Sequence, residues 1–94
     1  MAVIEFKWDA EKARTNLKKH GVRFEIAEAV FIDPNRITVI DDRFDYGEER
    51  LVTLGQTHDG LLVVVTTQRD DEQIIRIISV RKATKQERKT YASY

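Results

Sequence analysis

Residues Gln73 to Lys89, with the sequence QIIRIISVRKATKQERK, combine an apolar strand with a basic helix. Residues 74–81 are mostly isoleucine and valine, which are typical of a buried β-strand. Thr84 and Glu87 have the spacing of a capping box and predict a helix from residue 83 or 85 to about residue 91. Arginines and a serine interrupt the apolar strand. The segment therefore predicts a rigid platform with hydrogen-bond donors suited to phosphate groups.

Three further strands are predicted before this segment, at residues 36–40, 50–57 and 61–68. Asp59–Gly60 predicts a tight hairpin turn between the last two, and residues 70–72 predict a turn before the final strand. The run Val63–Val65 indicates a strand that is buried on both faces.

Two helices are predicted in the N-terminal half, after a short edge strand at residues 3–8. Asp9 is a favourable N-cap for the first helix, and Gly21 is a favourable residue to end it. Its core-facing stripe is expected to be Ala10, Ala13, Leu17 and His20. The second helix has Phe24, Ala27, Val30 and Phe31 on its inner face and stops at Asp33–Pro34–Asn35.

This order of elements predicts one α+β domain over residues 1–94. We expect an antiparallel sheet of about four strands, with an N-terminal edge strand, two N-terminal helices and one C-terminal helix. The helices are expected to pack on one face of the sheet and to leave the other face open for function.

The composition is that of a small domain without cysteine, with 16 basic and 16 acidic residues and a net charge of zero. A neutral total argues against a simple polyanion binder. The charges are nevertheless segregated, because the only acid from residue 73 to the end is Glu87, among six basic residues. No segment has the length and apolar character of a signal peptide or a bilayer span, so we expect a cytoplasmic protein without a membrane partner.

Three groups of residues, spread along nearly the whole chain, carry a family resemblance. The first group is Trp8–Asp9, Lys12–Ala13, Asn16, Lys19–His20–Gly21–Val22 and Phe24–Glu25–Ala27. The second is Glu49–Arg50 and Leu54–Gly55. The third is Val64–Val65–Thr67–Arg69, Arg76–Ile77–Ile78–Ser79–Arg81–Ala83 and Glu87–Tyr91. In this order the three groups resemble the opening, middle and end of the BrnT-type toxins.

The resemblance implies a RelE-like fold and a ribonuclease toxin of a type II toxin–antitoxin module. It implies metal-independent RNA cleavage that inhibits translation, acting on single-stranded or ribosome-associated RNA. It also implies a cognate antitoxin, typically with a ribbon-helix-helix DNA-binding part, through which operator DNA would be bound. No cofactor is expected.

Cleavage of this kind needs a base for the 2′-OH, cations for the phosphoryl oxygens and an acid for the leaving oxygen. The arginines on or beside predicted strands are Arg50, Arg69, Arg76 and Arg81. In a regular strand Arg81 and Ser79 share one face and Arg76 lies on the other, so Arg76 joins them only if the strand bends or bulges. Arg81 and Ser79 are therefore the preferred pair, with Arg69 at the rim. The competing interpretation for each arginine is a structural ion pair with a carboxylate.

Glu49 and His20 compete for the role of the base. Glu49 would need a raised pKa, whereas His20 has an ordinary pKa closer to neutrality. The competing interpretation of His20 is a packing role at the end of its helix. His58 is expected to be only a turn residue.

Five other residues are candidates for RNA binding: Lys19, Lys82, Lys85, Arg88 and Tyr91. Tyr91 can instead anchor the last helix to the sheet, as its apolar ring favours. Neither the histidines nor the acids have the spacing of a metal site. The alternative to a ribonuclease is a non-enzymatic interaction module that binds a DNA-binding partner, which the neutral charge favours. A direct DNA-binding protein is disfavoured, because no helix-turn-helix spacing is present.

Overall fold

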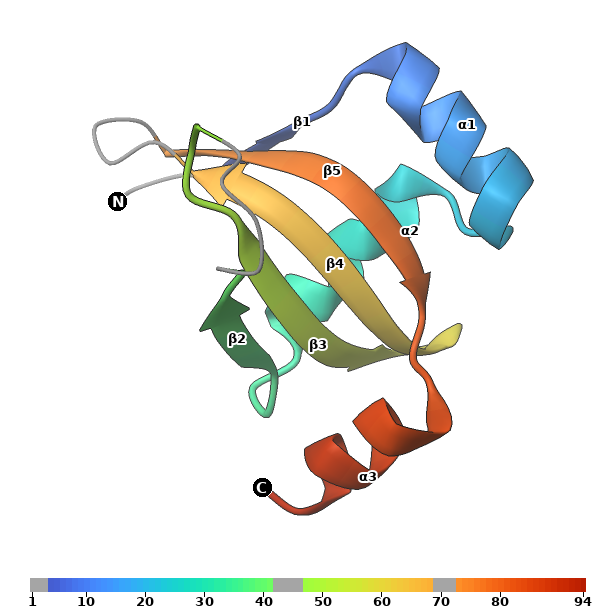
Figure 1. Ribbon diagram of the computed structural model, residues 1–94, viewed down its shortest axis with the longest axis vertical. Helices are drawn as coiled ribbons and strands as arrows, with labels where there is room; N and C mark the ends of the chain where they lie inside the picture. The colour runs from blue at the N-terminus through green and yellow to red at the C-terminus, as the bar shows by residue number, and fades with distance from the viewer. Residues whose placement is uncertain (1–3, 42–46, 69–72) are drawn as a thin grey trace.

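The structure, a computed structural model, describes residues 4–41, 47–68 and 73–94. A single sheet of five strands in the order β1-β5-β4-β3-β2 forms its centre (Figure 1). The strands are β1 (Glu5–Lys7), β2 (Ile37–Ile40), β3 (Leu51–Thr57), β4 (Gly60–Gln68) and β5 (Ile74–Lys82). The helices are α1 (Ala10–His20), α2 (Phe24–Ala27), the 3-10 helix η1 (Glu28–Ile32) and α3 (Lys85–Ala92).

The α+β architecture predicted from the sequence is confirmed, with one change in the sheet. β2, β3, β4 and β5 pair in antiparallel fashion, but β1 pairs with β5 in parallel, so the sheet is mixed. The chain reaches the end of β1 and crosses through α1, α2 and the three middle strands before β5 returns alongside it. The predicted turn at residues 70–72 lies outside the described residues.

The helix boundaries follow the capping signals in the sequence. The side chain of Asp9 accepts a hydrogen bond from the backbone N–H of Glu11, and Gly21 ends α1 with a φ of 71°. At α3, Thr84 and Glu87 form the complete capping box. The predicted second helix is not a single α-helix. It begins as α2 and continues after Ala27 as the 3-10 helix η1.

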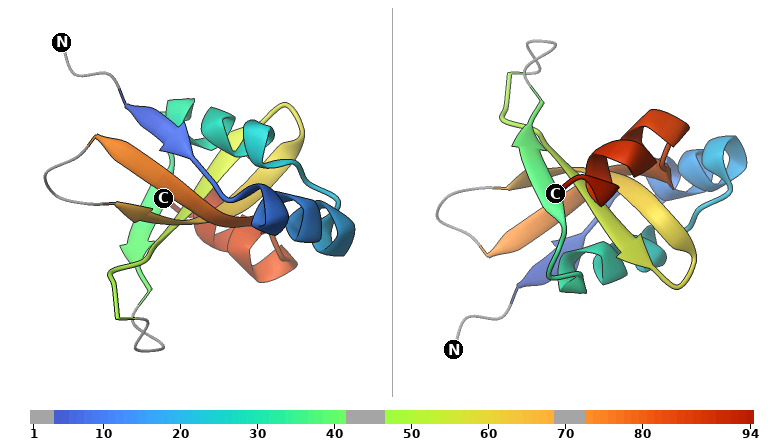
Figure 2. Two further views of the ribbon diagram at one scale, coloured as in Figure 1. Left: turned by 90° about the horizontal axis from the view of Figure 1, so that it is seen from above. Right: turned by 90° about the horizontal axis from the view of Figure 1, so that it is seen from below.

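The helices lie on both sides of the sheet, which corrects the prediction that they share one face. α2 and η1 cover one face, whereas α3 lies across the end of the other (Figure 2). We call the second face, which carries Leu54, Val63 and the residues in register with them, the open face. Helix α3 covers only the part of it near Leu54, Val63 and Ala83.

The main core lies between the sheet and α2 and η1. Its fully buried side chains include Phe24, Leu62, Val64, Ile77 and Val80. Gly55 lets η1 approach closely, since a Cβ atom there would lie 2.7 Å from Cγ1 of Val30. The predicted burial of β4 on both faces is confirmed at Val63 and Val64.

The predicted stripe of α1 is wrong at its centre. Leu17 is exposed, and the buried residue of α1 is Asn16. The Nδ2 atom of Asn16 donates to the carbonyl oxygens of Val80 (2.8 Å) and Val22 (3.0 Å), and its Oδ1 atom accepts from the N–H of Val80 (3.1 Å). β1 pairs with β5 only up to Arg76. Further along the same edge of β5, the side-chain amide of Asn16 bonds the backbone N–H and C=O of Val80, as a neighbouring strand would.

A β-bulge in β5 changes which side chains face the same way. Val65 of β4 pairs with Ser79, but the next residue, Thr66, pairs with Ile77, so Ile78 is the extra residue. One inserted residue reverses the alternation of every side chain beyond it. The bulge therefore decides the composition of the open face.

Candidate functional site

A groove between α1 and the bulged part of β5 brings several predicted site residues together. The groove has a volume of about 370 Å³. A separate hollow of about 580 Å³ lies beside Tyr91 and Asp33. The lining of the groove beside β5 includes Lys12, Lys19, His20, Ile78 and Ser79. Two candidate catalytic residues and one candidate RNA-binding residue thus share one hollow.

His20 lies in the last turn of α1, which ends on three consecutive basic residues. Basic side chains at this end interact favourably with the helix dipole. Burial, and then the positive charges of Lys19 and Arg81, lower the pKa of His20 from its ordinary value of 6.5. His20 is therefore mostly neutral at pH 7, the state in which an imidazole accepts a proton. Arg81 lies two residues beyond Ser79 on β5, and Ser79 lines the groove.

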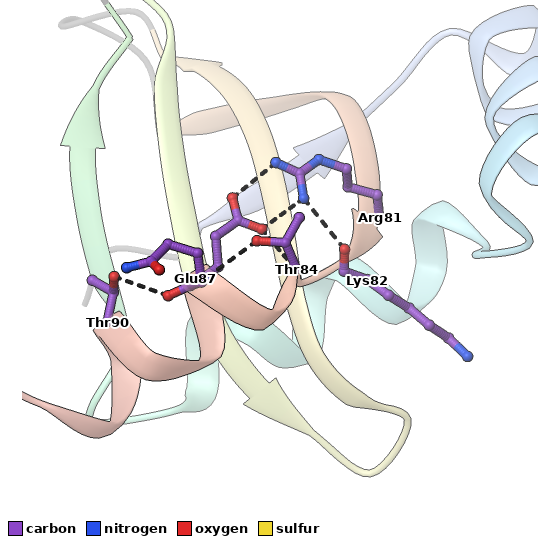
Figure 3. A network of polar contacts seen from close by, with 6 residues as sticks. Arg81, Lys82, Thr84, Glu87 and Thr90 are labelled. Atoms are coloured by element: carbon purple, nitrogen blue, oxygen red, sulfur yellow. Dashed lines mark hydrogen bonds and ion pairs between the residues drawn. The ribbon is translucent and has the colours of Figure 1, made fainter.

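Arg81 of β5 forms an ion pair with Glu87 of α3. Its Nη1 and Nη2 atoms donate to Oε1 and Oε2 of Glu87 at 2.8 and 2.9 Å (Figure 3). Glu87 also accepts from the backbone N–H of Thr84, so the cap of α3 and the arginine of β5 use the same carboxylate. The bond from Arg81 is the largest cause that lowers the pKa of Glu87 to about 2. The structural ion pair considered for the arginines is thus present at Arg81.

This arrangement fixes the direction of the guanidinium group before any ligand arrives. Nη1 of Arg81 also donates to the carbonyl oxygen of Lys82 at 3.3 Å, so the guanidinium group is bonded to both Glu87 and Lys82. The side chain of Arg81 is 38% exposed. A preorganised and partly exposed arginine at the edge of a groove can interact with an anionic group.

The register places Ser79 and Arg81 on the same face, as predicted. Arg81 pairs with Val63 and Ser79 pairs with Val65, and these valines alternate onto the open face of β4. The prediction that Arg76 lies on the opposite face is wrong. Because of the bulge, Arg76 pairs with Thr67, which shares the face of Val63 and Val65.

Glu49 and Arg50 do not join this group of residues. Both residues precede β3. Leu54 of β3 pairs with Val63, which in turn pairs with Arg81, so these three residues form one row across the sheet. Glu49 is five residues before Leu54, which places it roughly 16 Å from this row along the strand direction. Nη2 of Arg50 lies 3.7 Å from Oε1 of Glu48, and the carbonyl oxygen of Arg50 accepts a hydrogen bond from the backbone N–H of Asp41. His20 lines the groove together with Ser79, whereas Glu49 is not part of its lining. Arg69 lies outside the described residues.

The remaining RNA-binding candidates are distributed over the end of β5 and α3. Lys82, Lys85 and Arg88 are exposed. Tyr91 is half-buried beside Leu54 and Val63, and its hydroxyl donates to the carboxylate of Asp33. This bond to Asp33 is the main reason that the pKa of Tyr91 is raised. The alternative in which Tyr91 anchors α3 matches these contacts, and His58 lies in its turn as expected.

Two features of the site had not been assigned from the sequence. Asn16 supports the groove by holding β5 against α1, and its signal was an asparagine in the middle of a helix, where this residue is a poor helix former. From the sequence, Glu87 was assigned only as a helix cap. It lies six residues after Arg81, and its contact with Arg81 depends on the direction that α3 takes after the end of β5.

Within residues 4–41, 47–68 and 73–94, no group of three or more His, Cys, Asp or Glu residues could hold a metal ion. Among the same residues, no helix has the length and apolar character needed to cross a bilayer.

Comparison with known proteins adds one finding. Residues 8–87 match the family model described as "Ribonuclease toxin, BrnT, of type II toxin-antitoxin system". The match includes the groove, Arg81 and Glu87. No curated protein matches the chain.

Proposed function

Because the chain belongs to the BrnT family of ribonuclease toxins of type II toxin–antitoxin systems, we propose that it cleaves RNA without a metal ion at the groove between α1 and β5. The observation that carries the proposal is the shared position of His20 and Ser79 in this groove, with Arg81 near enough to lower the histidine's pKa. These residues supply a neutral base, a hydroxyl donor and a fixed cation, which are parts that cleavage of a phosphodiester requires.

In the proposed reaction, His20 takes the proton of a ribose 2′-OH. The 2′-oxygen then forms a bond to the adjacent phosphorus atom while the bond from phosphorus to the 5′-oxygen breaks. Arg81 and Ser79 stabilise the negative charge on the phosphoryl oxygens, and the leaving 5′-oxygen receives a proton from water. The products are a 2′,3′-cyclic phosphate and a 5′-hydroxyl.

The direct test is incubation of the purified chain with single-stranded RNA in EDTA, with and without ribosomes. We expect cleavage and a 2′,3′-cyclic phosphate end, identified by mass spectrometry of the products. The single-turnover rate should rise with pH up to the pKa of His20, below 6.5, and then level off, since only the neutral imidazole acts as the base. His20→Gln should remove this rise.

The matched control for His20→Gln is Lys18→Gln, an exposed substitution in the same turn of α1. Absence of cleavage by the wild-type chain under both conditions would contradict the proposed reaction. Cleavage with the same pH profile in His20→Gln would remove the histidine from the role of the base and return Glu49 to consideration.

We also propose that a cognate antitoxin, with a ribbon-helix-helix DNA-binding part, holds the toxin inactive and carries the complex to operator DNA. Family membership supports the antitoxin and the RNA substrate, and the zero net charge agrees with a chain that does not bind DNA on its own. Expression of the chain alone should stop growth, and co-expression with the protein of the neighbouring gene should restore it.

The second candidate function is an interaction module without enzymatic activity, and the neutral charge is the observation that favours it. The growth experiment separates the two functions. A module that only binds its partner would leave growth unaffected when it is expressed alone, and it would still purify together with the neighbouring gene's product.

A further inference from the structure

We propose that Arg76 binds a second phosphate group of the RNA, on the open face of the sheet and at a distance from the groove. This inference rests on the proposed RNA substrate and extends its site. It predicts that the protein recognises a single-stranded segment of several nucleotides rather than one phosphodiester group.

The first step is the position of Arg76 relative to Arg81. Five positions separate them in the sequence, so a regular strand would direct their side chains to opposite faces. The extra residue Ile78 reverses this relation, and the two arginines pair with Thr67 and Val63 on the same face of β4. A bulge that reorients a side chain beside a site is a recurrent use of this irregularity.

The second step is the spacing. Val63 and Thr67 are four positions apart on β4, which places the two arginine rows roughly 13 Å apart along the strand. A stacked strand with a rise of ~3.4 Å per nucleotide covers this length in about four nucleotides, and an extended strand covers it in fewer. The spacing therefore suits two phosphates of one short single strand.

The third step is the state of Arg76 itself. It is exposed, and within the described residues its side chain forms no hydrogen bond or ion pair, in contrast to Arg81 with Glu87. An arginine side chain stays protonated and offers a planar fork that fits two phosphate oxygens. Arg76 can thus bond a phosphate without first giving up a carboxylate.

The fourth step is access. Helix α3 packs at the other end of the open face, against Leu54, Val63 and Ala83 (Figure 1). Between the two arginine rows the surface consists of half-buried Val65, Thr67 and Ser79. No described helix covers this part, so a nucleic acid strand can lie along β5 from the groove to Arg76.

The test compares Arg76→Gln with Arg23→Gln, an exposed arginine beside α2 on the covered side of the sheet. Cleavage is measured on a ten-nucleotide RNA and on a dinucleotide that is too short to reach both rows. For the longer RNA we expect Arg76→Gln to lower kcat/KM about tenfold, through KM, with kcat nearly unchanged. The dinucleotide should be cleaved as by the wild type, and Arg76→Lys should restore part of the loss.

Binding of the longer RNA, followed by fluorescence anisotropy at several salt concentrations, provides a readout that does not depend on cleavage. Loss of one phosphate contact should weaken binding about tenfold and reduce the slope of log affinity against log salt by ~0.7. If the wild type binds RNA without cutting it, the proposed reaction fails and the Arg76 subsite is still tested. Equal binding by Arg76→Gln and Arg23→Gln, or equal effects on both RNA lengths, would overturn the subsite.

Discussion

The two faces of the sheet use neighbouring residues of the same strands for different purposes. On the covered face Leu62, Val64, Ile77 and Val80 are buried beneath α2 and η1. On the open face their neighbours include Ser79, Arg81 and the exposed Arg76. Beside the covered face the buried amide of Asn16 forms three hydrogen bonds. An unpaired buried polar group would be costly there. The polar side chains Ser79, Arg81 and Arg76 of the open face are partly or fully exposed.

The largest effect on stability is expected at the edge of the covered face. Asn16→Ala removes three hydrogen bonds and leaves the backbone groups of Val80 without the side chain that pairs with them. The free energy of unfolding should fall by about 2–4 kcal/mol, measured by urea denaturation. Lys18→Ala, an exposed change on the same helix, is the control. Equal stability of the two variants would show that the edge of β5 is held by other contacts.

A somewhat smaller effect is expected where η1 approaches β3. Gly55→Ala places a Cβ atom 2.7 Å from Cγ1 and 2.9 Å from the carbonyl oxygen of Val30, so the covered face must shift to accommodate it. Such overpacking costs about 1–3 kcal/mol, visible as a lower midpoint of thermal unfolding. Gln56→Ala at the next, exposed position should change the midpoint little. An unchanged midpoint in Gly55→Ala would contradict the close packing described for this face.

The smallest effect on stability is expected on the open side, at the pair of Arg81 and Glu87. Glu87→Gln should lower the free energy of unfolding by about 1 kcal/mol at pH 7, because the pair is partly exposed and therefore screened by solvent. The folded pKa of Glu87 is about 2, below its ordinary 4.5, so the stabilisation is complete above pH 4.5 and is lost as the pH falls toward 2.

Unfolding curves of the wild type and Glu87→Gln at pH 7 and near pH 3 measure this directly. The difference between the two proteins should shrink at the lower pH. A difference that stays constant with pH would mean that the carboxylate contributes through packing rather than through its charge.

Local signals in the sequence were sufficient to predict most of the elements. Asp9, Gly21 and the capping box of Thr84 with Glu87 act within a few residues, so they can be read without tertiary information. The parallel pairing of β1 and the position of α3 could not be read in this way. Both depend on contacts between segments that are distant in sequence.

The site was predictable only in part, and the bulge is the main reason. Ser79 and Arg81 lie beyond the bulge and keep their predicted relation, whereas Arg76 lies before it and changes face. The adjacent isoleucines Ile77 and Ile78 break the alternation of a regular strand and are the signal for the irregularity. His20 and Glu49 were competing candidates for the base from the sequence, which held no information on their distance from Arg81.

The measurement that tests the division between the faces most directly is the single-turnover rate of RNA cleavage by Arg81→Ala, taken together with its free energy of unfolding. We expect a rate at least about 100-fold below that of the wild type, as for the loss of a group that stabilises transition-state charge, with a loss of stability of only about 1 kcal/mol. Arg23→Ala should keep both quantities near their wild-type values. A rate for folded Arg81→Ala within a few-fold of the wild type would show that Arg81 does not stabilise the transition state of cleavage.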